Sequence, residues 1–238
     1  MNDRTALVTG ANKGIGKHIA SQLAAEGFTV YVGSRDVGRG QRVVEEIGGD
    51  ARLLVLEVTD TDSITKAAAQ VDHLDVLVNN AGISVSLTPP AEADAEEFRR
   101  TYETNVFAVV EVTNAFLPAL RRSPHPRIVN ISSGTGSLTW STNPNPQFTP
   151  GNGRAAAYRS SKAALNALTV FYAQTLAEEG FKVNALAPGV RATDLTPGAA
   201  AAGGDPADAA QGAVRLALLP DEGPTGAFFS WDGTPVPW

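Results

Sequence analysis

Short apolar segments alternate with longer helical patterns along the chain. The apolar segments are rich in Val, Ile and Leu, which is typical of strands that are buried on both faces of a parallel sheet. The pattern predicts strands at residues 5–8, 29–32, 53–58, 74–78, 127–131, 182–186 and 227–230. It predicts helices at residues 15–26, 39–47, 62–70, 93–120, 158–179 and 206–220.

This alternation of strands and helices indicates the fold class. Strands joined by helical crossovers pair in parallel, and the right-handed rule for crossovers favours a doubly wound sheet with helices on both faces. We expect a single α/β domain over residues 1–238 with about seven strands. Two segments interrupt the pattern: residues 134–157 predict a long loop, and residues 194–205 predict a mobile loop. A surface excursion without function is the alternative for both.

The composition narrows the possible functions. The 238 residues include 19 Lys and Arg against 25 Asp and Glu, a net charge of −6, which disfavours binding to a nucleic-acid backbone. The absence of cysteine excludes a disulfide framework, a Cys-ligated zinc site and a thiolate nucleophile. The chain shows no export signal and no apolar run long enough to cross a bilayer, so we expect a cytoplasmic protein without membrane contact.

A glycine-rich turn lies between the first predicted strand and the first predicted helix. Its sequence is Thr9-Gly10-Ala11-Asn12-Lys13-Gly14-Ile15-Gly16. Glycines let a ligand approach the backbone closely, and free N–H groups at the start of a helix favour a phosphate. A Walker A loop does not fit, because five residues rather than four separate Gly10 from Gly16-Lys17. The turn predicts a dinucleotide phosphate site, with a glycine turn that holds no ligand as the alternative.

The residues after the second strand bear on the choice of dinucleotide. Ser34 and Arg35 follow this strand, and a cation there suits the 2′-phosphate of NADP, with Lys13 as a second cation. Asp36 is the competing feature, because a carboxylate near this position can bind the ribose 2′-hydroxyl of NAD. We weigh the cation pair above the offset acid and predict NADP, with NAD as the less favoured alternative.

Tyr158 and Lys162 are four residues apart in a predicted helix and therefore share one of its faces. A free phenol has a pKa of about 10, which is high for proton exchange at neutral pH. A nearby ammonium stabilises the phenolate and lowers that pKa, so the pair can form a general acid and base. Taken alone, such a pair is also common on helix surfaces.

Six motifs in order give the chain a resemblance to the short-chain dehydrogenase/reductase family. They are the glycine turn, Asn79-Asn80-Ala81-Gly82 after the fourth strand, Asn105 in Thr104-Asn105-Val106, Ser133 after the fifth strand, Tyr158 with Lys162, and Pro188, Gly189 and Thr193 after the sixth strand. The resemblance covers nearly the whole chain. It is greatest to carbonyl-reductase-type members, through Asn12-Lys13 and Ser34-Arg35-Asp36. It implies a Rossmann-type fold and oxidoreductase activity.

The resemblance also implies roles for individual residues. Tyr158 would protonate the substrate oxygen, and Ser133 would hydrogen-bond it. Lys162 would lower the pKa of Tyr158 and hold the nicotinamide ribose, and Asn105 would hold a relay water; these four residues form the expected catalytic group. The expected cofactor-binding residues are Gly10, Asn12, Lys13, Gly14, Ile15, Gly16, Ser34, Arg35, Glu57, Val58, Asn80, Ala81, Gly82, Tyr158, Lys162, Pro188, Gly189, Arg191 and Thr193. No metal is expected.

Two positions depart from the family pattern. Glu57-Val58 stands where Asp-Val is common, near the adenine, and Glu can still accept a hydrogen bond there. Arg191 stands where an apolar residue is usual, beside the expected site of the nicotinamide amide. The backbone of Arg191 can still bind the cofactor, and its side chain is a candidate for shaping the substrate mouth.

Together these observations predict an NADPH-dependent reductase of ketones or aldehydes that also runs in reverse as an alcohol dehydrogenase. A cofactor-binding regulator or scaffold without turnover is the alternative from another class, and a dehydratase or epimerase is a third possibility. No G-x-S-x-G motif supports a hydrolase, and His18, His73 and His125 lack metal-ligand spacing. The expected partner is a small carbonyl compound, with residues 134–157 and 194–205 near its mouth. The oligomeric state stays open.

Overall fold

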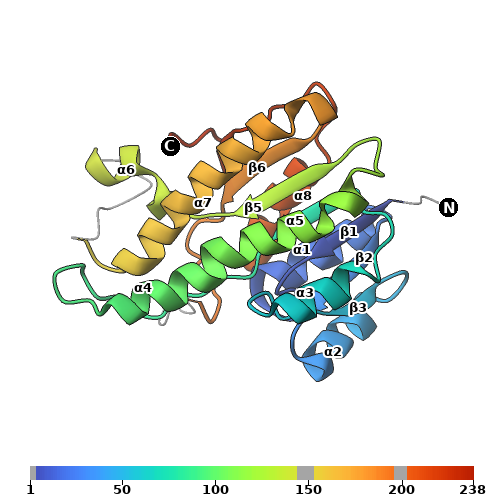
Figure 1. Ribbon diagram of the computed structural model, residues 1–238, viewed down its shortest axis with the longest axis horizontal. Coiled ribbons are helices and arrows are strands. Elements are labelled where there is room, and N and C mark those ends of the chain that lie inside the picture. Colours follow the sequence, from blue (N-terminus) through green and yellow to red (C-terminus); the bar gives the residue numbers. More distant parts are fainter. Residues whose placement is uncertain (1–3, 144–152, 196–202) are drawn as a thin grey trace.

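Seven strands form one parallel sheet at the centre of the protein (Figure 1). The computed structural model describes residues 4–143, 153–195 and 203–238. The strand order is β3-β2-β1-β4-β5-β6-β7, and every neighbouring pair is parallel. The strands are β1 (Thr5–Val8), β2 (Thr29–Ser34), β3 (Arg52–Val55), β4 (Val76–Asn79), β5 (Arg127–Ile131), β6 (Lys182–Ala187) and β7 (Phe228–Ser230). The predicted doubly wound α/β class is confirmed.

Helices cover both faces of this sheet. They are α1 (Gly14–Ala25), α2 (Val37–Ile47), α3 (Thr61–Ala68), α4 (Ala95–Tyr102), α5 (Ala108–Leu120), α6 (Leu138–Thr142), α7 (Ala156–Thr175) and α8 (Pro206–Ala217). Ile19 of α1 and Ala213 of α8 pack in one core, and Phe116 of α5 and Ala173 of α7 pack in the core on the other face. Each fully buried Ile or Phe contributes about 1.5–3 kcal/mol. None of the described helices is long and apolar enough to span a membrane.

The connections reverse direction between β1 and β4. These two strands are neighbours in the sheet, and their register pairs Leu7 with Leu77 and Val8 with Val78. In a doubly wound sheet the segments that leave such a pair pass to opposite faces, so a crevice opens beyond the carboxyl ends of the strands. The fold therefore brings the glycine turn after β1 and the Asn79-Asn80 motif after β4 to one crevice.

Two strands differ from the prediction at their ends, since β3 ends at Val55 rather than at residue 58 and β4 begins at Val76 rather than at residue 74. The larger differences lie between the core strands. The helix expected over residues 93–120 consists of α4, a π-helical turn η1 (Glu103–Phe107) and α5, which Figure 1 shows as one continuous rod. Residues 134–157 do not form a simple loop, because residues 134–142 fold into the 3₁₀ turn η2 (Gly134–Gly136) and α6. Residues 144–152 of that predicted loop lie outside the described residues, and its last two residues, Ala156 and Ala157, belong to α7.

The predicted mobile loop at residues 194–205 is likewise only partly described. Residues 196–202 lie outside the described residues, and Gly204 forms an isolated β-bridge with Arg191. Asp205 then caps α8, because its carboxylate accepts a hydrogen bond from the Ala207 N–H at 2.8 Å. Between the end of α7 and the start of β6 lies the 3₁₀ turn η3 (Ala177–Glu179).

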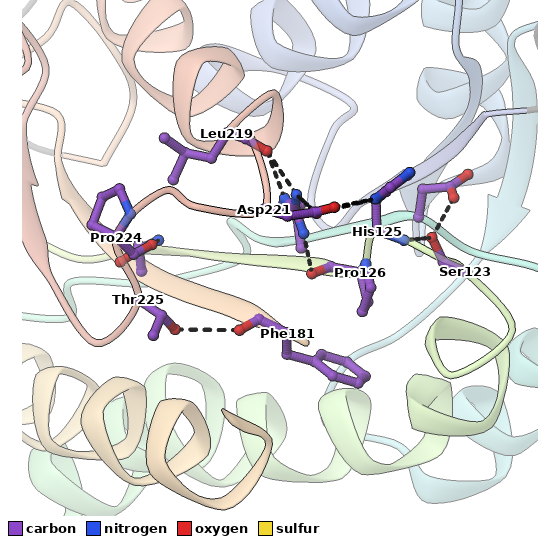
Figure 2. A network of polar contacts seen from close by, with 11 residues as sticks. Ser123, His125, Pro126, Phe181, Leu219, Asp221, Pro224 and Thr225 are labelled. Atoms are coloured by element: carbon purple, nitrogen blue, oxygen red, sulfur yellow. Dashed lines mark hydrogen bonds and ion pairs between the residues drawn. The ribbon is translucent and has the colours of Figure 1, made fainter. Parts of the chain in front are cut away.

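A polar network closes the amino-terminal ends of β5 and β6, at the sheet edge opposite the crevice. Figure 2 shows Asp221 beside His125 and Leu219 in this network. Arg127, the first residue of β5, is buried, and its Nε and Nη2 donate to the Leu219 carbonyl at 2.9 and 2.7 Å. Nη2 also lies 2.7 Å from Asp221, and Arg127 and His125 together hold the pKa of that carboxyl below its ordinary value. The network ties the segment before β7 to β5.

Replacing Arg127 with Met is expected to lower the free energy of unfolding by about 1.5–3 kcal/mol, because the charge-assisted hydrogen bonds to the partly buried Leu219 carbonyl are lost. Urea unfolding at pH 7 measures this change. Arg121→Met is the matched control, because Arg121 pairs with Glu179 at the exposed surface and such pairs add little. Equal losses in the two variants would contradict the structural role given to Arg127.

Candidate active site

A cleft of about 730 Å³ lies at the carboxyl ends of the strands. It is lined by most of the residues predicted to bind a cofactor: Gly10, Asn12, Lys13, Gly14, Ile15, Gly16, Ser34, Arg35, Glu57, Val58, Asn80, Ala81, Gly82, Tyr158, Lys162, Pro188 and Thr193. Gly189 and Arg191 are not among the lining residues. The glycine turn and the Tyr158–Lys162 pair, which are almost 150 residues apart in the sequence, therefore open onto one space.

The glycine turn is braced by the motif that follows β4. The side-chain amide of Asn80 donates to the Thr9 carbonyl at 2.8 Å, and the Thr9 hydroxyl accepts from the N–H groups of Asn80 and Ala81 at 3.0 Å. Gly10 has a φ of +63°, and a Cβ there would lie 3.1 Å from the Ala81 Cα. A Cβ on Gly16 would lie 2.8 Å from the Gly10 carbonyl. Only glycine permits this close packing.

The start of α1 supplies an anion-binding end to the cleft. The side chain of Lys13, the N-cap residue, makes no capping hydrogen bond to this helix, and the first helical residues, Gly14, Ile15 and Gly16, line the cleft. The N–H groups of a first helical turn lack partners within the helix and carry the positive end of its dipole. The arrangement therefore fits the pyrophosphate of a dinucleotide, and Thr193 borders it with its methyl group 3.5 Å from where a Cβ of Gly14 would lie.

Two cations that line the cleft, Lys13 and Arg35, are paired with carboxylates, and the part of the cleft beside them is called its outer end. Nζ of Lys13 lies 2.9 Å from Oδ2 of Asp194, and Nη1 of Arg35 lies 3.1 Å from Oε2 of Glu57. The hydrogen bond from Lys13, with the charges of Lys13 and Arg39, holds the pKa of Asp194 below its ordinary value. Asp194 and Arg39 also line the cleft but were not predicted, since no local pattern in the sequence shows that they meet Lys13.

Asp36, the acid that could favour NAD, is engaged by its own helix. Its Oδ1 accepts a hydrogen bond from the Arg39 N–H at 2.9 Å and caps α2, and its Oδ2 lies 3.2 Å from Nε of Arg39. The Ser34 hydroxyl donates to the Asp36 carbonyl at 2.8 Å and fixes the turn. The carboxylate therefore caps α2 and also lines the cleft, while Arg35 on the same turn reaches toward Glu57.

Tyr158 and Lys162 project from α7 into the inner part of the cleft. Lys162 is buried, and its Nζ donates to the Ile131 carbonyl at the end of β5 at 2.9 Å. Burial lowers the pKa of Lys162 to about 8. The same Nζ lies 5.7 Å from the centroid of the Tyr158 ring.

Burial raises the pKa of Tyr158, and a hydrogen bond with Ser133 opposes that rise. Without a cofactor, Ser133 rather than Lys162 is the group that favours the phenolate. The reason is that the Lys162 ammonium is directed to the Ile131 carbonyl and is itself disfavoured by burial. The Ser133 hydroxyl is further fixed by the Thr135 N–H at 3.2 Å and lies 2.9 Å from the Thr135 hydroxyl.

Asn105 lies in the π-helical turn η1, fully buried behind Lys162 and Gly82. Its Nδ2 donates to the Ile83 carbonyl at 2.9 Å and to the Ser161 hydroxyl at 3.0 Å, and its Oδ1 accepts from the Ile83 N–H at 2.9 Å. Both amide protons are therefore used. A relay water on Asn105 would have to use the second lone pair of Oδ1 or the backbone carbonyl.

Arg191, whose side chain is a candidate for shaping the substrate mouth, is not among the described residues that line the cleft. Its Nε donates to the Pro188 carbonyl at 2.6 Å, and its guanidinium lies 4.3 Å from the ring centroid of Trp231. Asp208 is 3.9 Å away on α8. This buried cation holds the segment after β6 against α8 and the loop after β7. Within the described ranges, no group of three or more His, Asp or Glu side chains is placed to hold a metal ion.

The chain is similar in sequence and in fold to several known proteins. The short chain dehydrogenase family model matches residues 4–202. Salutaridine reductase from Papaver bracteatum is 32% identical, with 95% of this chain and 94% of that protein covered. (-)-Isopiperitenone reductase from Mentha piperita is 35% identical, with 96% of both covered. The solved structure of an NADPH-bound carbonyl reductase from chicken fatty liver is 30% identical, superposes with a TM-score of 0.85 and covers 100% of both chains.

The buried ammonium of Lys162 is expected to destabilise the cofactor-free protein below about pH 8. The pKa of Lys162 falls from 10.5 in the unfolded chain to about 8 in the folded protein. Between pH 8 and pH 10.5 the folded state therefore binds fewer protons than the unfolded state, and the free energy of unfolding rises with pH across this range. Lys162→Met removes the charge at the cost of one hydrogen bond. We expect it to be about 1–3 kcal/mol more stable than the parent at pH 7.

Urea unfolding of both proteins from pH 7 to pH 10.5 tests this prediction. The advantage of Lys162→Met is expected to shrink steadily above pH 8, where the parent lysine no longer carries a charge in the folded state. If the free energies of unfolding of the two proteins changed with pH in the same way, Lys162 would not be a buried ammonium that is disfavoured by folding.

Proposed function

The chain belongs to the short-chain dehydrogenase family of NAD(P)-dependent oxidoreductases, and on this premise we propose that it is an NADPH-dependent reductase of small ketones or aldehydes. The observation that carries the proposal is that one cleft is lined by an uncapped helix start, by two cations at its outer end, and by Tyr158 and Lys162 at its inner end. In the reverse direction the same site oxidises an alcohol.

The preference for NADPH rests on the outer end of the cleft. When bound, the cofactor supplies a hydride to the carbonyl carbon. Arg35 and Lys13 both line the cleft and provide the positive charge that a 2′-phosphate requires, and this pair outweighs the single Asp36 carboxylate, which also caps α2. The similar carbonyl reductase from chicken fatty liver has NADPH bound in its crystal structure, which supports the same choice.

The inner end of the cleft is suited to proton donation. The raised pKa of Tyr158 keeps its phenol protonated at neutral pH, so that it can donate to the oxygen of a carbonyl as negative charge develops there. Ser133 supplies a second hydrogen bond to that oxygen. Lys162 holds the ribose next to the nicotinamide, and its positive charge stabilises the phenolate left by proton transfer.

The substrate would enter beside the inner part of the cleft. Three apolar side chains, Ile83, Ala192 and Leu195, are among the residues that line the cleft. A partly apolar carbonyl compound fits such a lining. The similar proteins from Papaver and Mentha are both named as reductases, which supports the direction of reaction.

Arg35→Ala is expected to weaken NADPH binding by about 1.5–3 kcal/mol, the loss of one hydrogen bond to a charged group, and to leave NADH binding nearly unchanged. Fluorescence titration with both cofactors measures this. Arg42→Ala is the control, because Arg42 lies on α2 away from the cleft lining and donates to the Gly38 carbonyl. Equal losses for NADPH and NADH would rule out a 2′-phosphate contact at Arg35.

Tyr158→Phe is expected to lower carbonyl reduction by about 10²–10⁴-fold, the range for a positioned acid, and to leave NADPH affinity nearly unchanged. Lys162→Ala should lower turnover and cofactor affinity together, because it removes both a charge and a ribose contact. Turnover on a panel of ketones and aldehydes, followed through nucleotide absorbance, is measured beside NADPH titration.

The contrast between these two variants separates an enzyme from a cofactor-binding regulator. In a regulator, Tyr158→Phe would be silent and no member of the panel would be reduced by the parent. Near-normal turnover of Tyr158→Phe on a substrate that the parent reduces would show that another group donates the proton.

A further inference from the structure

Residues 234–238, which follow β7, form a strap over α6. The Ser137 hydroxyl donates to the Pro237 carbonyl at 2.5 Å. Thr139 donates twice to the main-chain oxygen of Trp238, from its N–H at 3.1 Å and from its hydroxyl at 2.7 Å. The Trp238 ring stacks on Phe228 of β7, with ring centroids 5.3 Å apart and an interplanar angle of 18°. The strap therefore fastens α6 to the edge strand of the sheet.

The 3₁₀ turn η2, which follows Ser133, is enclosed between α6 and α7. Trp140 of α6 covers Gly134, where a Cβ would lie 2.8 Å from Cζ3 of the indole. On the other side, a Cβ on Gly136 would lie 2.8 Å from the backbone carbonyl carbon of Lys162. The turn has no spare room on either side, so its position follows that of Trp140.

A second contact joins α6 to α7 next to Tyr158. Nη2 of Arg159 donates to the Ser141 hydroxyl at 3.0 Å, and that hydroxyl donates to the Ser137 carbonyl at 2.8 Å. Ser137 is fully buried at the start of α6. The strap is thus connected through α6 to two residues of the proposed reaction. One connection runs through η2 to Ser133, and the other runs through Arg159 to the neighbouring Tyr158.

We propose that Trp238 and Thr139 are positioning residues that set the placement of the Ser133 hydroxyl relative to the Tyr158 hydroxyl. The inference rests on the proposed function, because it concerns these two hydroxyls as partners of the substrate oxygen. A misplacement of about 1 Å at a reacting group can cost about 100-fold in rate. In the described part of the chain, neither the strap nor α6 lines the cofactor cleft, so the effect should fall on kcat and spare NADPH binding.

The test uses two pairs of variants in the full chain. Trp238→Ala removes the stack on Phe228, and Trp238→Phe keeps an aromatic ring there. Thr139→Val removes the hydroxyl bond to the strap at nearly constant volume, and Thr139→Ser keeps it. Thr142→Val is the matched control, because Thr142 is an exposed residue of the same helix whose hydroxyl donates to the Leu138 and Thr139 carbonyls rather than to the strap.

We expect kcat to fall by about 10-fold or more in Trp238→Ala and by about 3-fold in Thr139→Val, with the dissociation constant of NADPH within about 2-fold of the parent. Trp238→Phe and Thr139→Ser should restore most of kcat, and Thr142→Val should match the parent. Circular dichroism confirms folding, and Thr139→Val decides the question if Trp238→Ala does not fold.

Three results would overturn the inference. The first is an unchanged kcat in folded Thr139→Val and Trp238→Ala. The second is a fall of kcat in Thr142→Val as large as that in Thr139→Val. The third is a loss of NADPH affinity as large as the loss of kcat, which would indicate a general disturbance of the fold. In each of these the parent still reduces its substrate, so the proposed function stands. A parent that binds NADPH but reduces no carbonyl compound overturns the proposed function, and the inference with it.

Discussion

The hydrogen bond from Nζ of Lys162 to the carbonyl of Ile131 is the contact on which the candidate site depends. It satisfies a buried ammonium and the last carbonyl of β5 at once, and either group left alone would be costly. It fixes the register of α7 against the sheet, which places Tyr158 one turn earlier on the same face. Gly136 makes it possible, because a Cβ there would lie 2.8 Å from the backbone carbonyl carbon of Lys162.

Much of this arrangement follows from local patterns in the sequence. Apolar strands alternating with helices predict the doubly wound sheet, and a parallel sheet brings all its carboxyl ends to one edge. The glycine turn, Asn80 and Tyr158 each follow a strand or lie on a helix that starts at that edge. Their position in one cleft is thus a consequence of topology. Topology does not assign chemical roles to these residues, and the expected roles come from the resemblance of the motifs to the family.

The remaining features depend on contacts between distant segments, which no local pattern encodes. The π-helical turn at Asn105 arises where its amide bonds Ile83 and Ser161, and the sequence of the helix gives no signal of it. The side chain of Arg191 packs on the aromatic face of Trp231, some 40 residues later in the sequence. In the same way α6 forms within an expected loop because the strap supplies acceptors for Ser137 and Thr139.

The two ion pairs at the outer end of the cleft have a consequence for how a dinucleotide is held. Lys13 and Arg35 already have carboxylate partners in Asp194 and Glu57, so a phosphate that arrives there exchanges one anion for another. The gain in binding free energy is smaller than it would be for two unpaired cations, and the two ion pairs can form again when the phosphate leaves. A redox cosubstrate has to leave after every catalytic cycle, and such an exchange favours rapid turnover of the nucleotide over its permanent retention.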